Sequence, residues 1–413
     1  MKLSGIETHE HLQAIKKGMV MNMNNKNWVS VWGNAVSIAE HHPEAYAKYI
    51  TLRYPVYIPF AGDTLRFTFD NYCGSEAVTV TRATVSVATS PVYEKMPLAC
   101  PCKKETICDI TFSKNESVTM EAHQTAVSDP VSFPVKKGMT LTVSLYFADF
   151  TLMQSAVLVT GPLSKGFFSL GDQTHADALP MDTTKTTNWF YFLSNIELMT
   201  AEENHTVICY GDSITAGAWP DYLTLLARQN PDNHTSFIRR ATSGSRVLRQ
   251  YECITYDSYG LKGTNRFPHE IPTTGADTVI IQQGINDIIH PVGIETNPFR
   301  PMSDLPTAKE LIDGYRYYIE EAKKSHLKVY MGTLLPIFGW RTYATFRDDL
   351  RNELNAWIRS AKEIDGCIDF DLALRGSENP SAFREGFDSG DHLHPSSKAY
   401  QAMAECAYEV LQR

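Results

Sequence analysis

The sequence lacks a hydrophobic run long enough to cross a membrane, because no stretch approaches the roughly 18 apolar residues that a spanning helix needs. Residues 1–20 also lack the apolar core of a signal peptide. These absences predict a cytoplasmic protein with no membrane partner, although a secreted protein with a trimmed signal would show the same N-terminus. We expect residues 1–25 to form a polar or helical leader without a functional site.

The sequence also lacks basic clusters. Its formal net charge is -9, and none of its basic stretches exceeds three residues. Nucleic acids and anionic membranes are bound through clustered Lys and Arg, so this charge pattern argues against both as partners. With 413 residues the chain is longer than one typical domain, which predicts two domains with a core each. Whether it forms a homo-oligomer is open.

Paired C-x2-C motifs of the zinc-binding type are absent. Five cysteines lie apart in apolar contexts, where reduced, buried thiols are expected: Cys73, Cys209, Cys253, Cys367 and Cys406. The other three, Cys100, Cys102 and Cys108, cluster in PLACPCKKETIC. A structural loop and a redox or metal-binding role both remain open for this cluster.

The sequence does contain a serine on a predicted strand-to-helix turn. Residues 207–210 form an apolar run typical of a buried parallel strand, Gly211-Asp212-Ser213 interrupts it, and a helical pattern resumes near Pro220. This order places the Ser213 hydroxyl at the carboxyl edge of a sheet, beside helix amides that can stabilise an oxyanion. Gly-Asp-Ser is also ordinary turn composition, so its partners decide its meaning.

Two later segments could supply those partners. Gly284-Ile285-Asn286-Asp287 follows the apolar run 278–281, so the Asn286 amide is expected at the end of a second strand. Asp391-His392-Leu393-His394 precedes the last predicted helix, and its Asp-x-x-His spacing lets one loop supply a base and the carboxylate that orients it. His392 competes with His394 as the base, and Asp388 is a further carboxylate nearby. A metal site built from Asp391, His392 and His394 is the alternative.

These motifs resemble the SGNH hydrolases, the family of GDSL esterases. Four family marks occur in family order: Ser213 in Gly-Asp-Ser, Gly244 in Ser-Gly, Asn286 in Gly-Ile-Asn-Asp, and Asp391 with His394. The resemblance implies a three-layer α/β/α domain with a flavodoxin-like parallel sheet over residues 201–413, which the alternation of strand and helix patterns also indicates. The asparagine that often precedes the glycine is replaced around residues 239–241, which affects the hydrogen bonds of that loop.

The resemblance also implies roles for these residues. Ser213 is the nucleophile, His394 the base and then the acid, and Asp391 the group that orients the imidazole. The Ser213 N–H, the Gly244 N–H and the Asn286 amide form the oxyanion hole. The family pattern favours His394 over His392 and argues against a metal, so neither a cofactor nor a metal is expected. Asp212 is expected to cap local amides at the turn.

Aromatic residues in predicted loops are candidates for the substrate pocket. The polar and aromatic segment 251–272 reads as irregular and would wall the site. Candidate pocket residues are Asp212, Tyr256, Phe267 and Trp340, with Tyr343 nearby. Such rings suit sugar stacking, an acyl pocket or plain packing equally.

The N-terminal half is rich in short strand patterns separated by turn residues, of which the alternating 65–69 is typical. This predicts a β-sandwich, jelly-roll-like, accessory domain over residues 26–200. Its motifs resemble the domain that precedes the hydrolase domain in a two-domain SGNH subfamily, which includes xylan-associated esterases of gut and soil bacteria; these motifs lie at 28–32, 51–53, 62–71 and 127–131.

The residues therefore predict a serine esterase that hydrolyses short-chain, acetyl esters through an acyl-enzyme. An O-acetylated sugar or oligosaccharide as substrate rests on the subfamily resemblance and the β-domain only. The alternatives are a general short-chain arylesterase, thioesterase or lysophospholipase, and a carbohydrate-binding protein whose hydrolase domain is catalytically dead.

Overall fold

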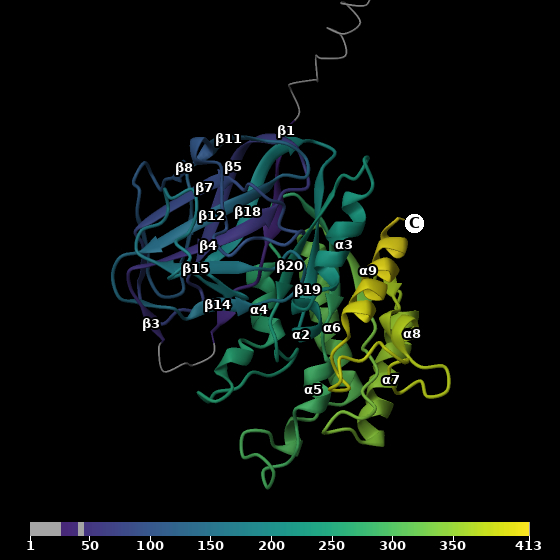
Figure 1. Ribbon diagram of the computed structural model, residues 1–413. Coiled ribbons are helices and arrows are strands. Elements are labelled where there is room, and N and C mark those ends of the chain that lie inside the picture. Colours follow the sequence, from purple (N-terminus) through teal and green to yellow (C-terminus); the bar gives the residue numbers. More distant parts are fainter. Residues whose placement is uncertain (1–25, 40–44, 413) are drawn as a thin grey trace, which may run out of the picture.

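The computed structural model describes residues 26–39 and 45–412, so the expected leader at 1–25 lies outside the described residues. Two units lie side by side in Figure 1, a β-rich unit coloured purple to teal and an α/β unit coloured teal to yellow. The β-rich unit ends with β18 (Leu193–Ala201), and the α/β unit begins with β19 (His205–Gly211). No helix in the described part of the chain is long and apolar enough to cross a membrane.

The β-rich unit consists of antiparallel strands in two main sheets. The first has the order β1-β18-β5-β10, with β11 also paired to β5: β1 (Lys26–Gly33), β5 (Gly62–Asp70), β10 (Thr125–Val127) and β11 (Val131–Val135). The second has the order β16-β15-β4-β12-β7-β8: β4 (Ile50–Tyr57), β7 (Arg82–Val87), β8 (Cys108–Ile110), β12 (Thr140–Phe147), β15 (Gly166–Leu170) and β16 (Lys185–Thr187). Short pairings complete the unit: β2 (Ser37–Ile38), β3 (Tyr46–Ala47), β6 (Val78–Val80), β9 (Val118–Met120), β13 (Thr151–Leu152), β14 (Ser155–Leu158) and β17 (Trp189–Tyr191).

The core of this unit lies between the two main sheets. Phe67 and Phe69 of β5 are fully buried, as are Val143 and Leu145 of β12, and all four belong to one apolar cluster. In β5, residues 64–69 alternate between half-buried and buried, as expected for a strand with one face on a core. The predicted β-sandwich is confirmed.

The α/β unit is built on a five-stranded parallel sheet of order β20-β19-β21-β22-β23. The further strands are β20 (Thr235–Ala241), β21 (Ala276–Gln282), β22 (Lys328–Gly332) and β23 (Gly366–Ile368). The helices are α2 (Ser213–Ala216), α3 (Trp219–Arg228), α4 (Gly263–Glu270), α5 (Ile285–Ile289), α6 (Ala308–Lys324), α7 (Thr345–Ser360), α8 (Phe370–Leu374) and α9 (Ser397–Leu411). Short 3-10 turns in this unit are η2 (Asp257–Tyr259) and η3 (Met302–Asp304), and the β-rich unit contains η1 (Lys104–Thr106).

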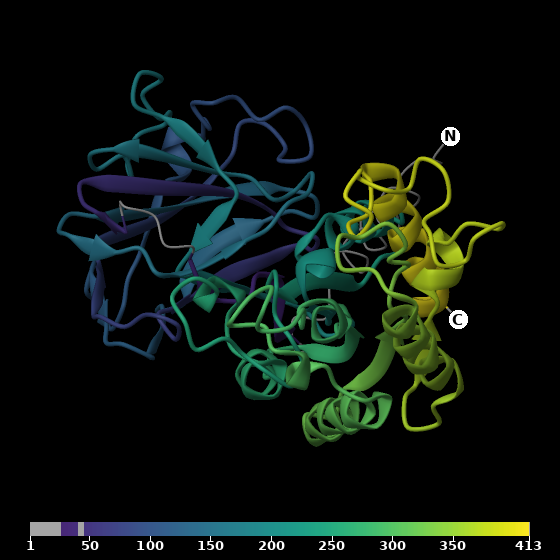
Figure 2. The ribbon, with the colours of Figure 1, turned by 90° about the horizontal axis from the view of Figure 1, so that it is seen from below.

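Helices cover the sheet in layers. α3 packs against α9, which also contacts α8, while α6 packs against α4, α7 and β22. Figure 2 shows these helices around the parallel strands, with the β-rich unit to the side. Because the sheet is covered on both faces, its central strands are continuous apolar runs, such as 207–210 and 279–281, in which every residue is buried. The predicted three-layer α/β/α fold is confirmed.

Local signals explain where the helices begin. At α6, Thr307 and Glu310 form a capping box, and Leu311, Tyr315 and Tyr318 face the core.

The prediction that segment 251–272 is irregular is wrong, because the segment contains η2 and α4. α4 spans eight residues and contains Pro268, so its helical pattern in the sequence is short and interrupted.

None of the eight cysteines, all of which lie in the described part of the chain, forms a disulfide, and this includes the three of the predicted cluster. Cys100 and Cys102 are buried, and burial raises the pKa of the Cys100 thiol to about 12. Such a thiol stays protonated at neutral pH and is a poor nucleophile and metal ligand. For Cys100, the state of the thiol therefore favours the structural-loop interpretation of the cluster.

The two units share an extensive polar and apolar interface. The Ser30 carbonyl of β1 accepts hydrogen bonds from the hydroxyls of Thr206 and Ser236, at 2.8 and 2.6 Å. The Thr160 N–H donates to the Ala216 carbonyl of α2 at 3.0 Å.

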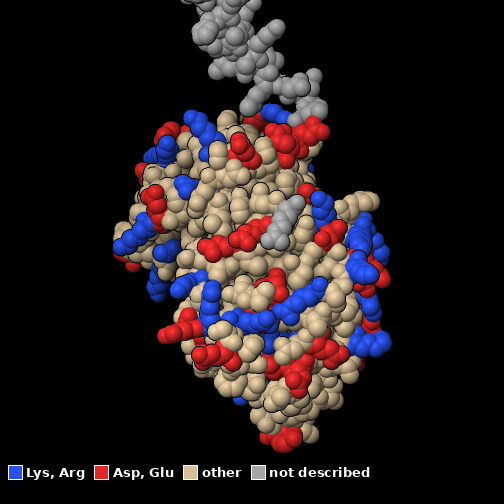
Figure 3. All heavy atoms as spheres, turned by 90° about the vertical axis from the view of Figure 1, so that its right-hand side faces the viewer, with Lys and Arg blue, Asp and Glu red and all other residues tan. Residues whose placement is uncertain are grey.

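Charged side chains of both signs lie interspersed on the face that carries α8 and α9 in Figure 1, with a band of basic groups across it (Figure 3).

Candidate active site

Ser213 is the first residue of α2, directly after the end of β19. Gly211 makes the turn feasible, since a Cβ there would lie 2.3 Å from both the Gln282 carbonyl oxygen and the Thr215 hydroxyl oxygen. Asp212 caps the helix, with its carboxylate accepting a hydrogen bond from the Ile214 N–H at 3.0 Å. The Ser213 side chain is thereby held at the carboxyl edge of the sheet, partly exposed to solvent.

A hydrogen-bonded line joins Ser213 to His394 and Asp391. The Ser213 Oγ lies 2.9 Å from His394 Nε2, and His394 Nδ1 lies 2.6 Å from Asp391 Oδ2. The other Asp391 oxygen accepts hydrogen bonds from the N–H groups of Leu393 and His394, at 3.0 and 2.9 Å. The Asp-x-x-His spacing thus folds into one tight turn that orients its own imidazole. This is the serine–base–carboxylate geometry of acyl-transfer catalysis.

The electrostatics of Asp391 suit that arrangement. Burial disfavours its charged form, but the hydrogen bonds from the backbone and ring of His394 and from the Leu393 N–H outweigh it and lower the pKa to about 2. Asp391 is therefore a carboxylate at any pH at which an esterase works. A fixed negative charge beside Nδ1 would stabilise an imidazolium formed by proton transfer from Ser213 to His394.

The neighbouring histidine has a different partner. His392 Nδ1 lies 2.5 Å from Asp388 Oδ2, and its side chain is about half exposed. The His392 N–H also donates to Asp388. The structure thus separates the two Asp–His pairs of this loop, and His394 is the one that reaches Ser213. Among the described residues no group of three or more His, Cys, Asp or Glu side chains is arranged to hold a metal ion.

The candidate oxyanion donors lie at the same sheet edge. Gly211 pairs with Ala241 on one side and Gln282 on the other, so the segments that follow these strands start beside the Ser213 turn. Gly244 has φ +78, and a Cβ there would lie 2.3 Å from the Tyr259 ring. The Asn286 side chain donates to the Ser245 carbonyl at 3.0 Å, which ties α5 to the loop that contains Gly244.

Asn286 carries the first testable prediction. Its amide has two hydrogens, of which one is used by Ser245, so one remains for an oxyanion. We expect Asn286→Ala to lower kcat on p-nitrophenyl acetate by about 100- to 1,000-fold, with a much smaller change in KM. Steady-state kinetics measure this, with the melting temperature recorded to separate lost chemistry from lost folding. An unchanged kcat in a folded variant would exclude Asn286 from the oxyanion hole.

Two buried carboxyl groups support this edge. Burial raises the pKa of Asp212 to about 7, although the Ile214 N–H and the charge of Arg266 act in the opposite direction. Burial also raises the pKa of Asp287 to about 6, with hydrogen bonds from the Val247 and Leu248 N–H groups acting against the rise. Both are conformational supports: Asp212 holds the start of α2, and Asp287 holds the loop after Gly244.

The raised pKa of Asp212 predicts a pH-dependent stability. Its ordinary value is 3.8, so between pH 4 and 7 the folded protein binds this proton more tightly than the unfolded chain. The free energy of unfolding should therefore fall as pH rises through this window, by about 1.4 kcal/mol for each unit of pKa shift. Asp212→Asn should be nearly free of this term. Urea unfolding at pH 5 and pH 8 measures it, and equal slopes in both proteins would contradict it. Asp287 acts in the same direction in both proteins, so the difference between them reports the contribution of Asp212 and of its interaction with Asp287.

The predicted pocket residues have different outcomes. Phe267 is fully buried and stacks on Tyr318, with ring centroids 4.5 Å apart, so its prediction as a pocket residue is wrong. Asp212 is fully buried too and caps α2 without lining a surface pocket. The sequence places both segments near the catalytic edge of the sheet, but it does not show that these two side chains point into the core. Tyr256 and Trp340 are partly exposed, and their prediction as substrate-pocket residues stands as a prediction.

Two residues at this edge were missed by the sequence analysis. Tyr259 of η2 covers Gly244, and its ring also stacks on His290 at 5.2 Å. Arg266 of α4 is buried, and its guanidinium donates to the Gly211 carbonyl at 2.9 Å and to the Thr242 hydroxyl. It therefore connects the segments that precede Ser213 and Gly244. No motif marks either residue, because their segment lacks a clear period.

A parallel sheet covered by helices, with a serine, a histidine and a carboxylate hydrogen-bonded in line at its carboxyl edge, defines the class of serine acyl hydrolases. Residues 209–402 match the model of the GDSL-like Lipase/Acylhydrolase family. The chain therefore contains a GDSL-type acylhydrolase domain, in agreement with the SGNH resemblance of its motifs.

Comparison with solved structures finds similar chains of this kind. A GDSL-like lipase from Bacteroides thetaiotaomicron is 20% identical, with a TM-score of 0.38, and the match covers 51% of this chain and 89% of that one. A member of the lipolytic G-D-S-L family from Veillonella parvula is 18% identical, with a TM-score of 0.33 and coverages of 51% and 99%. A carbohydrate esterase family 3 protein from Talaromyces cellulolyticus is 17% identical, with a TM-score of 0.36 and coverages of 50% and 96%. No curated protein sequence matches the chain significantly.

Proposed function

We propose that this acylhydrolase cleaves short-chain esters, with O-acetylated sugars or oligosaccharides as its natural substrates, and that Ser213, His394 and Asp391 carry out the reaction. The observation that carries the proposal is the hydrogen-bonded line from the Ser213 hydroxyl through His394 to a carboxylate with a pKa of about 2. No other base contacts Ser213 among the side-chain hydrogen bonds of the described residues.

The reaction follows from these groups. His394 Nε2 takes the hydroxyl proton as the Ser213 Oγ bonds to the ester carbonyl carbon, and the carbonyl oxygen becomes an oxyanion. The N–H groups of Ser213 and Gly244 and the Asn286 amide receive that charge. His394 then gives its proton to the departing alcohol oxygen, which leaves an acetyl-serine. A water molecule, deprotonated by His394, releases acetate in the same way.

The surroundings of Gly244 support a small acyl group. The Tyr259 ring lies directly against this glycine and packs with Tyr251 and His290, at centroid distances of 5.7 and 5.2 Å. An aromatic cover beside an oxyanion donor leaves little depth for a long acyl chain. We therefore infer a preference for acetyl over longer esters.

Polar surroundings support a sugar as the alcohol part. A cavity of about 610 Å³ lies along the loop that follows Gly244; its lining includes Arg246, Gln250, Lys262 and Asn265 but not the catalytic residues themselves. This lining suits hydroxyl groups better than a lipid chain. Gly339 lies close to the catalytic loop, because a Cβ there would be 2.8 Å from the His392 ring. The loop that contains the partly exposed Trp340 therefore lies beside the loop that contains His394.

The test is acetate release from acetylated xylo-, manno- and gluco-oligosaccharides, beside p-nitrophenyl esters of two to eight carbons, with Ser213→Ala as the background. A strong preference for one acetylated glycan is expected. Activity on aryl esters alone would keep the serine mechanism and reject the glycan substrate. No turnover of any ester by the folded protein would reject catalysis and favour a binding protein with an inactive hydrolase domain.

A further inference from the structure

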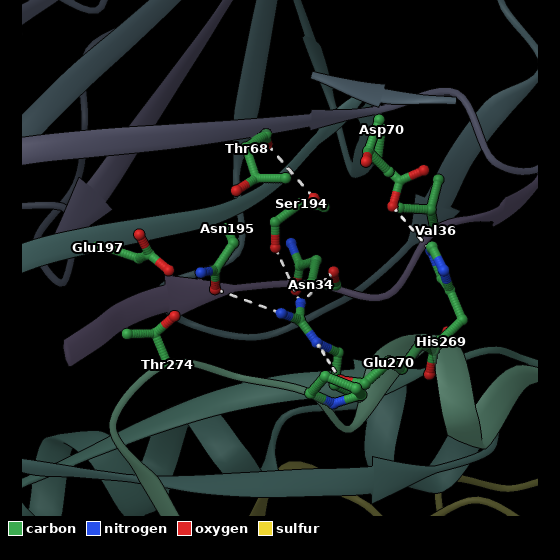
Figure 4. Close-up of a pocket in the computed structure, with 13 residues that line it drawn as sticks. Asn34, Val36, Thr68, Asp70, Ser194, Asn195, Glu197, His269, Glu270 and Thr274 are labelled. Carbon is green, nitrogen blue, oxygen red and sulfur yellow. Dashed lines mark hydrogen bonds and ion pairs between the residues drawn. The ribbon is translucent and has the colours of Figure 1, made fainter. Parts of the chain in front are cut away.

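A polar cavity of about 210 Å³ lies between the two units of the chain. From the β-rich unit it is lined by residues of β5, β10 and β18, including Thr68, Asp70 and Glu197, and from the α/β unit by Arg240, His269 and Glu270. Figure 4 shows these side chains around the cavity. It is separate from the cavity that follows Gly244, with which it shares no lining residue.

Glu270 is the unusual member of this lining. Its side chain is 3% exposed, and neither of its carboxylate oxygens accepts a hydrogen bond from the described part of the chain. The Arg266 Nε lies 3.7 Å from one of them, which is an ion pair without a hydrogen bond. A buried carboxylate is strongly favoured to accept hydrogen bonds, so two unused acceptors at a cavity wall indicate an occupant that donates to them.

Each carboxylate around the cavity has a basic partner, whereas the guanidinium of Arg240 is held by neutral groups. Asp70 pairs with His269 at 3.1 Å, Glu197 pairs with Arg66 at 2.5 Å, and Glu270 faces Arg266. Arg240 has its guanidinium occupied by the carbonyls of Asn34, Ser194 and Glu270 and by the Asn195 side chain. A cation would lie near Arg240, whose charge is held by neutral groups, and an anion would lie against unused carboxylate oxygens. The occupant should therefore be neutral and rich in hydrogen-bond donors.

The size of the cavity narrows the occupant further. Its volume of about 210 Å³ is far larger than the cavity volume on the order of 10–15 Å³ that one water molecule needs. It is below the roughly 300–1,000 Å³ of sites that hold drug-sized ligands. We propose that this cavity between the two units is a binding site for a neutral polyhydroxylated molecule of monosaccharide size, whose hydroxyl groups donate to Glu270 and to further polar groups of the lining.

Binding of D-xylose, D-glucose and glycerol to the full chain tests the proposal, by calorimetry or ligand-observed NMR. Ser213→Ala is the background, since it removes the esterase nucleophile and leaves the cavity intact; failure of the esterase proposal therefore does not affect this test. We expect saturable binding of at least one of these polyols. Glu270→Gln should weaken it by at least about tenfold, because a charged acceptor is lost.

A second variant guards against misfolding. Thr68→Val keeps the shape of its side chain and lies in the β-rich unit, so it should leave ester hydrolysis unchanged and weaken polyol binding by about threefold to tenfold. No saturable binding of any polyol would overturn the proposal and leave the cavity to water. Binding that survives both variants would place the site elsewhere. Ethanolamine is added to the same assay as a cationic probe, and its binding in preference to the polyols would contradict the proposal that the ligand is neutral.

Discussion

Replacement of Ser213 by alanine is expected to lower kcat on p-nitrophenyl acetate by about four to six orders of magnitude. The hydroxyl that would bond to the acyl carbon is removed, and His394 has no proton to accept from it. The fold should persist, because Ser213 is partly exposed and its hydroxyl contacts only the His394 ring among the side-chain hydrogen bonds of the described residues. Active-site titration and steady-state kinetics measure the loss, and an unchanged melting temperature shows that the fold is intact.

The two histidines of the same loop provide a matched control. His394→Ala should be about as inactive as Ser213→Ala, and the double variant hardly worse, because residues that act as one unit lose their effect together. His392→Ala removes a ring of the same kind two positions away, which pairs with Asp388 and not with Ser213, and should keep kcat within about a few-fold. If His392→Ala were the inactive variant, the assignment of the base would be wrong.

Much of the α/β unit could be predicted from the sequence, because its signals are local. The capping box and apolar spacing of α6 give both of its ends, and the apolar runs 207–210 and 279–281 indicate strands that are buried on both faces. The Asp-x-x-His spacing also suffices to anticipate a turn that holds both groups, because three residues fix the turn geometry.

The rest depends on contacts between distant segments. Arg239 and Arg240 lie in β20 as buried residues, although charged side chains in a strand ordinarily indicate an exposed face. Arg239 is buried because Asp221 of α3 pairs with it at 2.8 Å, and Arg240 because carbonyl groups of the β-rich unit accept its hydrogen bonds. Partners 18 or more positions away in sequence leave no periodic signal, so the burial of these two arginines could not be predicted from the sequence.

Arg266 shows what such buried charges do for the active site. Its side chain is 2% exposed; it donates to the Gly211 carbonyl and the Thr242 hydroxyl, and it is the nearest cation to the buried carboxylate of Glu270. Burial alone would lower the pKa of Arg266, but the charge of Glu270 reverses this and raises it. Burial raises the pKa of Glu270 even with Arg266 beside it. The guanidinium of Arg266 acts against this rise in the pKa of Glu270 and so favours its charged form.

Arg266→Met is accordingly expected to lower the free energy of unfolding at pH 7 by about 3–5 kcal/mol, because it leaves a buried charge without its partner. Since the loss of Arg266 raises the pKa of Glu270 further, the variant should lose more stability at pH 8 than at pH 5.5. Urea unfolding at both pH values measures this. Arg316→Met, which breaks exposed ion pairs with Asp313 and Glu363, is the control and should cost about 1 kcal/mol or less.

The double variant Arg266→Met/Glu270→Gln separates the two causes. If the uncompensated charge is what destabilises Arg266→Met, then the removal of that charge should restore most of the lost stability and remove the part of its pH dependence that Glu270 causes. Turnover should recover less, because the hydrogen bonds from Arg266 to Gly211 and Thr242 are still absent and the turns that carry Ser213 and Gly244 stay loosened. Stability and turnover that recovered together would show that Arg266 serves only to neutralise Glu270.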